Sequence, residues 1–139
     1  MSCNSLLYAL TNSTSSITSG STIPLSTIVR RYGQNVNLSG NNISLKGRGY
    51  YTVEVSATLA AVAEGNLSVM VLQDGVAVPG ANATVTATGA GDYVNLSVSC
   101  VVRLKGCSCA DTDTSIISLV YSGTTSATPT NVSCKVAKV

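Results

Sequence analysis

The segment with the most reactive side chains is KGCSCADTD, residues 105–113, in which two cysteines one residue apart precede two aspartates. Cys107 and Cys109 could bind a metal, act as a redox pair or join a disulfide, and Asp111 and Asp113 could add oxygen ligands. A C-x-C pair without a second cysteine pair nearby is, however, a weak signal for zinc. We therefore expect an exposed loop that holds no metal, and a disulfide that involves this loop stays open as an alternative.

The chain has three further cysteines, Cys3, Cys100 and Cys134, which makes five in total. An odd number cannot all pair within one chain, so the pattern does not indicate a disulfide framework. Cys100 and Cys134 alternate with polar residues in step with neighbouring valines, and we expect both in the core, where a free cysteine acts as a small apolar residue. Cys3 falls in the N-terminal segment.

Enzyme chemistry is limited by the absence of histidine. Without an imidazole, neither a Ser-His-Asp nor a Cys-His arrangement can be built, and zinc sites that use histidine are excluded as well. Six carboxylates remain, but four of them lie at predicted turns, where acidic side chains cap backbone amides. No phosphate-binding glycine motif is present. We expect a protein that is not an enzyme and that binds no cofactor.

Charge is sparse and evenly spread. Charged residues are 10% of the 139 residues, against about 25% in typical globular proteins, and the net charge is +2. Arg30 and Arg31 are the only adjacent basic pair, so the clustered basic stripe of a nucleic-acid-binding protein is missing. No apolar run is long enough to span a membrane, and the N-terminus lacks the features of a signal peptide. We expect synthesis in the cytosol, free thiols, and neither nucleic acid nor membrane as a partner.

A period of two runs through most of the sequence. In GYYTVEVSATL, residues 49–59, Tyr51, Val53, Val55, Ala57 and Leu59 share one face and polar residues share the other, which predicts a half-buried strand. The same alternation appears at residues 93–104, and further strands are expected at residues 6–10, 23–29, 66–75, 81–88, 114–123 and 130–139. Turn signals separate them, including Asp74-Gly75, Pro79-Gly80 and the stretch SGTTSATPT.

Nine or ten short strands with no helical period predict an all-β protein, a jelly roll of two antiparallel sheets. We expect one domain over residues 1–139, with a short N-terminal strand or arm and a polar loop at about residues 11–22. Counting chain reversals places KGRG, DGVAVPGAN and KGCSCADTD at one end of the sandwich and AAVAEG, GAGD and SGTTSATPT at the other.

Several segments resemble the trimeric jelly rolls of the tumour necrosis factor and complement globular-head superfamily. They are ISLKGRGYYTVEVSATL, GNLSVMVLQDG, DYVNLSVSCVVRLKG and NVSCKV. PLSTIVRRYG and LQDGVAVPGA are similar to a bacterial and phage branch, which includes phage virion structural proteins and the terminal domains of spore-surface proteins. The likeness covers nearly the whole chain after residue 5. This sequence departs from it in lacking phenylalanine and in the length of its CSCADTD loop.

The resemblance implies a homotrimer that packs through one sheet around a threefold axis. Transferred to this sequence, it points to the outward faces of residues 50–59, 93–104 and 131–138, with these interface candidates: Tyr50, Thr52, Glu54, Tyr93, Ser99, Val101, Arg103 and Lys135. The alternative is that these residues form no interface and are ordinary solvent-exposed polar positions. Two exposed tyrosines on polar faces favour an interface. A trimer could also gather three copies of the Cys107/Cys109 loop around a metal, which is a minor alternative.

The resemblance, the absence of catalytic groups and the low charge together predict a structural virion protein. It would be a capsid decoration protein or head fibre of a bacteriophage, located in the virion and in contact with other capsid proteins. An alternative of another class is a receptor- or carbohydrate-binding module of a phage fibre, in which an exposed tyrosine beside acids or amides would form the site. A spore-surface or secreted trimeric module is a third.

Overall fold

The computed structural model describes residues 5–12, 15–33, 35–40, 42–47, 49–104 and 114–139. These residues form ten strands and no helix, which confirms the all-β class and the expected number of strands. The strands are β1 (Leu6–Thr11), β2 (Thr27–Tyr32), β3 (Val36–Ser39), β4 (Asn42–Lys46), β5 (Gly49–Ala61), β6 (Gly65–Gln73), β7 (Val76–Ala87), β8 (Tyr93–Leu104), β9 (Thr114–Gly123) and β10 (Ala127–Lys138).

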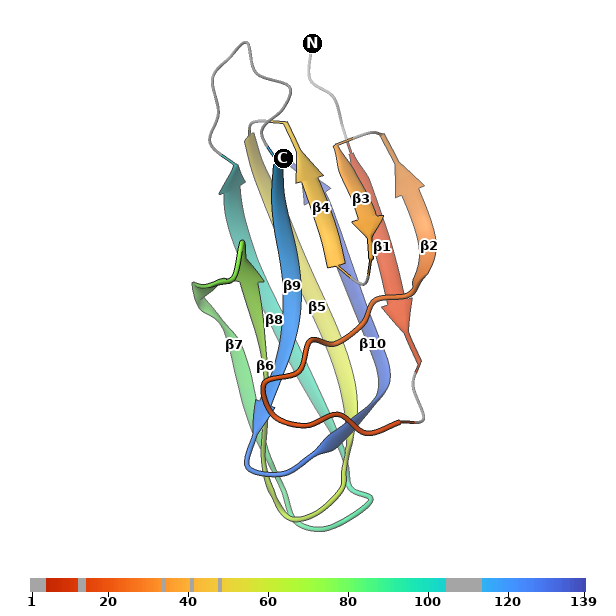
Figure 1. The fold of residues 1–139 in the computed structure, drawn as a ribbon, viewed down its shortest axis with the longest axis vertical. Coiled ribbons are helices and arrows are strands. Elements are labelled where there is room, and N and C mark those ends of the chain that lie inside the picture. Colours follow the sequence, from red (N-terminus) through yellow and green to blue (C-terminus); the bar gives the residue numbers. More distant parts are fainter. Residues whose placement is uncertain (1–4, 13–14, 34, 41, 48, 105–113) are drawn as a thin grey trace.

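Two five-stranded sheets lie face to face (Figure 1). The first sheet has the order β2-β1-β10-β5-β8 and the second sheet has the order β3-β4-β9-β6-β7. Every pairing between neighbouring strands is antiparallel. The predicted jelly-roll sandwich is therefore confirmed, and each sheet has one face toward the core and one face outward.

Alternation along the strands fills the space between the sheets. In β5, the side chains of Tyr51, Val53, Val55, Ala57 and Leu59 are buried as expected, while the residues between them are exposed or partly exposed. Full burial of a valine or leucine side chain contributes about 1.5–3 kcal/mol to stability, so a core of this kind supplies the main driving force for folding. The expected inward positions of β8 are buried too, except Cys100, which is half-buried.

The two largest core side chains, Tyr51 and Tyr121, keep their hydroxyl groups satisfied. Tyr51 donates to the carbonyl oxygens of Lys46 at 3.0 Å and Gly47 at 2.7 Å, and Tyr121 donates to the carbonyl oxygen of Thr125. Burial raises the pKa of both phenols because it disfavours the charged form. Each tyrosine thus fills the core with its ring and fixes a turn with its hydroxyl group.

The strand predicted at residues 23–29 is wrong in position, since β2 begins at Thr27. Ile23 and Leu25 are nevertheless buried, because the segment before β2 runs alongside β9. The amide of Ile23 donates to the carbonyl oxygen of Leu119 at 2.7 Å, and Thr22 forms a bridge with Val120. Pro24 has no amide hydrogen to continue that pairing. The predicted segment is thus divided: its first residues pair with β9 of the second sheet, and the chain then enters β2 of the first sheet.

The turn predicted at Pro79-Gly80 is also wrong, because both residues lie within β7. The register between β6 and β7 shifts between Met70 and Leu72, so that residues 78–81 of β7 stand opposite Val71 alone, and Gly80 takes a φ of 79° within this irregular bulge. The reversal itself is the two-residue turn Asp74-Gly75, with φ values of 52° and 82°. Positive φ at both positions is typical of the hairpin turn that matches strand twist.

The loops sort to two ends of the sandwich much as predicted (Figure 1). At one end, the amide of Ala61 donates to the carbonyl oxygen of Asp92 at 2.9 Å and the amide of Val62 donates to that of Ser126 at 3.1 Å, which joins three turns. The last of these turns is shorter than SGTTSATPT, since β10 already begins at Ala127. The ends of β4, β8 and β10 lie at the other end, and the β6–β7 turn stops short of it. Residues 105–113 fall outside the described part of the chain.

Candidate functional site

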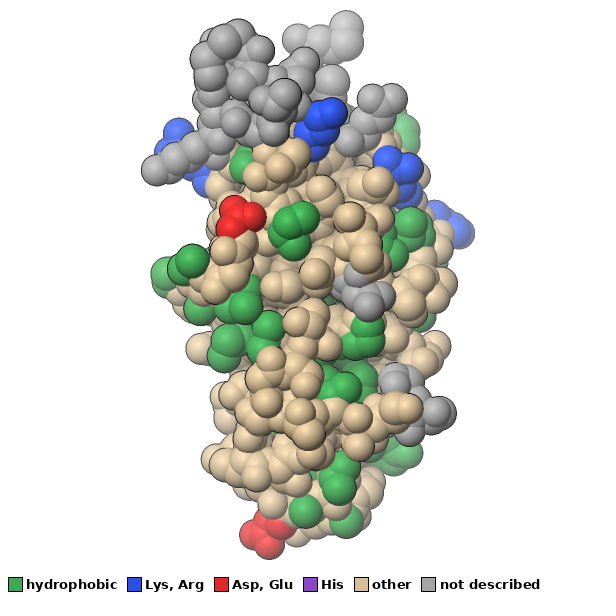
Figure 2. Space-filling model, in the orientation of Figure 1, with side chains coloured by type: hydrophobic (Ala, Val, Ile, Leu, Met, Phe, Trp, Pro, Cys, Tyr) green, Lys and Arg blue, Asp and Glu red, His purple; other side chains and the backbone are tan. Residues whose placement is uncertain are grey.

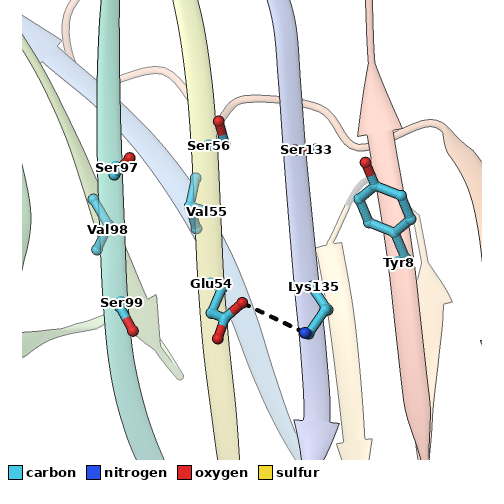
Figure 3. A pocket seen from close by; sticks show the side chains of 9 residues that line it. All are labelled: Tyr8, Glu54, Val55, Ser56, Ser97, Val98, Ser99, Ser133 and Lys135. Carbon is cyan, nitrogen blue, oxygen red and sulfur yellow. Dashed lines mark ion pairs between the residues drawn. The ribbon is translucent and has the colours of Figure 1, made fainter.

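The outward face of the first sheet is the candidate site. All eight interface candidates lie on three neighbouring strands of this sheet, the central strand β10, then β5, and the edge strand β8. Strand register brings three of them into one row: Glu54 stands opposite Lys135 on one side and Ser99 on the other. Tyr8 of β1 stands opposite Lys135 and extends this row. Figure 3 shows these side chains along four neighbouring strands.

Glu54 and Lys135 form an ion pair across β5 and β10. The Lys135 Nζ lies 3.5 Å from the Glu54 Oε2, and the side chains of Lys135 and Glu54 are 48% and 56% exposed, respectively. At this exposure, solvent screens the attraction and the pair contributes at most about 1 kcal/mol. In the isolated protomer the ion pair therefore adds little to stability, and its main effect is to hold two opposite charges together in the middle of the face.

A hollow of about 630 Å³ opens next to this ion pair (Figure 3). It is lined by Tyr8, Glu54, Val55, Ser56, Ser97, Val98, Ser99, Ser133 and Lys135. Its cause is visible in the register, since Ser56 stands opposite Ser133 on one strand and Ser97 on the other. Three small side chains in adjacent strands leave space above the sheet that larger neighbours enclose.

The end of the face nearer the C-terminus is aromatic and apolar. The guanidinium carbon of Arg103 lies 5.6 Å from the centre of the Tyr50 ring, which is the distance of a cation–π contact. Tyr50 is 50% exposed, and Val101 is 58% exposed on the adjacent row, opposite Thr52. The Thr52 hydroxyl donates to the carbonyl oxygen of Ala137 at 3.3 Å. Such exposed tyrosine and arginine side chains are typical of the centre of a protein interface.

Tyr93 is the interface candidate that the structure keeps apart from the others. It is 68% exposed and stands opposite Ala60, whereas Tyr50 stands opposite Arg103. Ten residues of extended strand, or about 34 Å, separate the two ends of this face. Tyr8, Ser56, Ser97 and Ser133, by contrast, line the hollow and were not among the candidates. Their outward parity is readable from sequence, but only the pairing of β1 with β10 brings Tyr8 to Lys135.

Both described cysteines have free thiols; Cys134 is buried in the core, and Cys100 is half-buried against it. Cys100 stands opposite Val53 and Cys134 stands opposite Val55, on the two strands that flank β5. Two strand spacings, or roughly 10 Å, exceed the Cα separation that a disulfide allows. Burial raises the pKa of Cys134 to about 12, so its thiol is a poor nucleophile at neutral pH. The predictions for Cys3, Cys107, Cys109, Asp111 and Asp113 concern residues outside the described part.

The described carboxylates are separated rather than gathered. Asp74 accepts hydrogen bonds from the Ser115 hydroxyl at 2.5 Å and the Ile116 amide at 2.9 Å. Hydrogen bonds from Thr88 lower the pKa of Asp92, so this carboxylate caps a turn in its charged form. No group of three His, Cys, Asp or Glu residues that could hold a metal occurs within the described ranges. In the same ranges, no helix is long and apolar enough to cross a membrane.

Comparisons with protein-family models and with curated proteins found no match. Solved structures match over nearly the whole chain. PRD1 vertex protein P5 has a TM-score of 0.63 at 15% identity and covers 100% of this chain and 99% of its own. Murine APRIL at pH 5.0 has a TM-score of 0.72 at 12% identity, with 98% and 99% covered. The globular domain of zebrafish complement 1qA has a TM-score of 0.60 at 10% identity, with 94% of each chain covered.

At these identities the likeness is one of fold. The two five-stranded sheets have the jelly-roll fold of the tumour necrosis factor and complement globular-head proteins, as the sequence resemblance predicted.

Proposed function

We propose that this chain is a structural protein of a bacteriophage virion, a capsid decoration protein or head fibre, which assembles as a homotrimer through the outward face of the first sheet. The observation that carries the proposal is this face itself, with its exposed Tyr50, Val101 and Tyr93 and its central hollow. The likeness to PRD1 vertex protein P5, a phage virion protein, supports the virion assignment, and the trimeric state of the solved neighbours supports the assembly.

The size of the face fits an interface. Its three long strands have twelve or thirteen residues and its two short strands have six. With about 3.3 Å per residue and 4.8 Å between strands, the sheet presents roughly 750 Å². A protomer of a trimer divides this area between two neighbours, and the total is close to the ~800 Å² that one partner buries in a single standard interface. Apolar side chains on a solvated sheet gain stability when a second copy covers them.

The Glu54–Lys135 pair gives the trimer specificity. Once a neighbouring copy covers the face, both charges leave bulk water, and the attraction between them strengthens while their hydration is lost. Removing one partner of a buried pair is costly, about 3–5 kcal/mol, because the other charge is left uncompensated. The pair therefore favours one packing register over others that would separate the two charges.

The first test measures mass and location together. Sedimentation of the purified chain is expected to show a particle of three times 14.1 kDa that dissociates on dilution. Labelling of intact phage particles with an antibody against the chain is expected to decorate the outer surface of the capsid. A monomer at every concentration would remove the trimer, and label confined to host cells would remove the virion role.

A second function, binding of a carbohydrate, is favoured by the lining of the hollow. Tyr8 offers an aromatic ring next to Lys135, which separates it from the Glu54 carboxylate, and the hydroxyl groups of Ser56, Ser97 and Ser133 line the same hollow. An aromatic surface with hydrogen-bonding groups suits the two kinds of surface of a sugar ring. This function requires the hollow to stay open in the assembly. Binding of a soluble oligosaccharide that Tyr8→Ala abolishes, with the trimer mass unchanged, would support it over the structural role of this hollow.

A further inference from the structure

The described cations gather at one end of the molecule. Even-numbered strands run toward the end that holds the C-terminus (Figure 1), and all six described cations lie in their C-terminal halves. They are Arg30 and Arg31 in β2, Lys46 in β4, Arg103 in β8, and Lys135 and Lys138 in β10. Glu64 and Asp92 lie in the turns that precede β6 and β8, at the opposite end. Figure 2 shows the blue side chains near the upper end of the molecule.

Three of these cations, Arg31, Lys46 and Lys138, are carried by one hydrogen-bonded frame around Asn35. The Asn35 side chain donates to the carbonyl oxygen of Lys46 at 2.6 Å, and the Lys46 amide donates to the carbonyl oxygen of Asn35 at 2.7 Å. The Ser5 hydroxyl donates to the Asn35 side chain at 2.9 Å. The Lys138 amide donates to the carbonyl oxygen of Ser5 at 2.9 Å, which ties the last strand to the frame.

The cationic groups of Arg31 and Lys138 lie close to this frame, and Lys46 belongs to it through its backbone. The Arg31 Nε donates to the carbonyl oxygen of Val36 at 3.3 Å, beside Asn35. The Lys138 Nζ lies 3.9 Å from the position that a Cβ on Gly47 would occupy, next to Lys46. We name the side chains of Arg31, Lys46 and Lys138 the basic platform. Its backbone is anchored to the core, since the Tyr51 hydroxyl group donates to the carbonyl oxygens of Lys46 and Gly47.

Within the described residues, no side-chain carboxylate forms an ion pair with the basic platform, and Lys135 with Glu54 is the one ion pair there. Asp74 already accepts hydrogen bonds from Ser115 and Ile116. By sequence, the residues outside the described part add two cations and two acids, so they leave the net charge unchanged. Like charges held on one hydrogen-bonded frame repel one another, and an anionic partner relieves that repulsion.

We propose that the basic platform is the docking surface for a carboxylate-rich protein surface, and that it attaches the trimer by this end. The inference rests on the proposed function, for which it names the chemistry of the partner. Packing three copies through their first sheets sets their like ends side by side, so a trimer presents three platforms to one partner surface. Several weak contacts made together bind far more tightly than one.

Protein carboxylates fit this end better than nucleic acid does. Tyr32 is 64% exposed beside Arg31, and Val139 is 80% exposed after Lys138, so apolar and aromatic side chains interrupt the cations. Arginine and tyrosine side chains together are enriched in protein interfaces, and the planar guanidinium group of arginine matches a carboxylate with two parallel hydrogen bonds. A nucleic-acid surface would need a continuous basic stripe that follows the phosphates.

The test uses immobilised poly-L-glutamate as the probe and the full chain as the analyte. The wild type is expected to bind at low ionic strength and to dissociate as salt screens the charges. Lys46→Gln combined with Lys138→Gln is expected to weaken binding on the order of tenfold, since each removes one contact with a carboxylate. The frame survives in this variant because its hydrogen bonds from these two residues use backbone atoms.

A control variant changes the net charge by the same amount at the other end. Ala63→Glu combined with Ala90→Glu places two acids in exposed turns far from the basic platform, and binding should stay within about twofold of wild type. Equal loss in both variants, absence of wild-type binding, or tighter binding to duplex DNA or phosphatidylserine vesicles would overturn the proposal. Light scattering on every sample separates this from the proposed function, since a monomer that still binds refutes only the trimer.

Discussion

Replacing Val101 by serine should weaken the trimer while leaving the protomer folded. Val101 lies on the outward face of β8 and is 58% exposed in the protomer, so its side chain contributes little to the core. A neighbouring copy that covers the face removes the remaining apolar surface from water. The serine side chain is smaller than that of valine and carries a hydroxyl group, so the change removes apolar contact without adding bulk or charge.

The size of the effect follows from the exposed fraction. Full burial of a valine contributes about 1.5–3 kcal/mol, so covering a side chain that is 58% exposed contributes roughly 1 kcal/mol per protomer. A trimer contains three copies and would lose about 3 kcal/mol, which raises its dissociation constant about 150-fold. Because the midpoint concentration of a monomer–trimer equilibrium follows the square root of that constant, it should rise about twelvefold.

Analytical ultracentrifugation over a dilution series measures that midpoint. Val76→Ser is the matched control, since Val76 is 69% exposed on β7 of the second sheet and lies outside the proposed interface. Its midpoint should equal that of the wild type, and at concentrations where the protein is monomeric both variants should unfold at similar urea concentrations, since each replaces one exposed strand valine by serine. The interface assignment is refuted if Val101→Ser leaves the midpoint unchanged, or if Val76→Ser shifts it as much.

Three further predictions concern the protomer. Tyr51→Phe should lower the free energy of unfolding in urea by about 1–3 kcal/mol, because the carbonyl oxygens of Lys46 and Gly47 lose a donor, and an unchanged midpoint would contradict that role. Gly47→Ala should cost about 1–3 kcal/mol in the same assay, since φ is 98° there and a Cβ would lie 2.5 Å from the Asn35 Nδ2; Gly75→Ala, with a positive φ but open space, should cost less. Cys134 favours the folded state only as a neutral thiol, so its contribution to stability is complete below pH 9. Between the ordinary thiol pKa of 9.0 and the folded-state pKa of about 12, the free energy of unfolding should fall by up to about 1.4 kcal/mol per pH unit. The variant Cys134→Ala should not show this decline.

Much of the fold was readable from the sequence because strand parity is a local property. The alternation in residues 49–59 and 93–104 assigned inward and outward faces correctly, and Cys134 was placed in the core by the valines on either side of it. The apolar pattern did not locate the strand correctly where the chain changes direction within a short apolar segment. Ile23 and Leu25 are buried as an apolar pattern predicts, yet they precede β2 instead of forming it.

The outward face of the first sheet shows the same division. Sequence parity alone selected Tyr50, Glu54 and Lys135 as outward residues, but a period of two says nothing about which strands are neighbours. Register decided that Glu54 meets Lys135, that Tyr93 lies at the far end, and that three serines meet over a hollow.

The sequence by itself determined the all-β class, the inward and outward face of most strands and the lack of histidine chemistry, because these depend on residue type and local alternation. Only the tertiary structure decided which charges share an end. The cations of four different strands are spread through the sequence, and because only two basic residues are adjacent, the sequence gives no sign that they cluster. They gather because antiparallel pairing turns every second strand toward the same end of the sandwich, so residues far apart in the chain become neighbours.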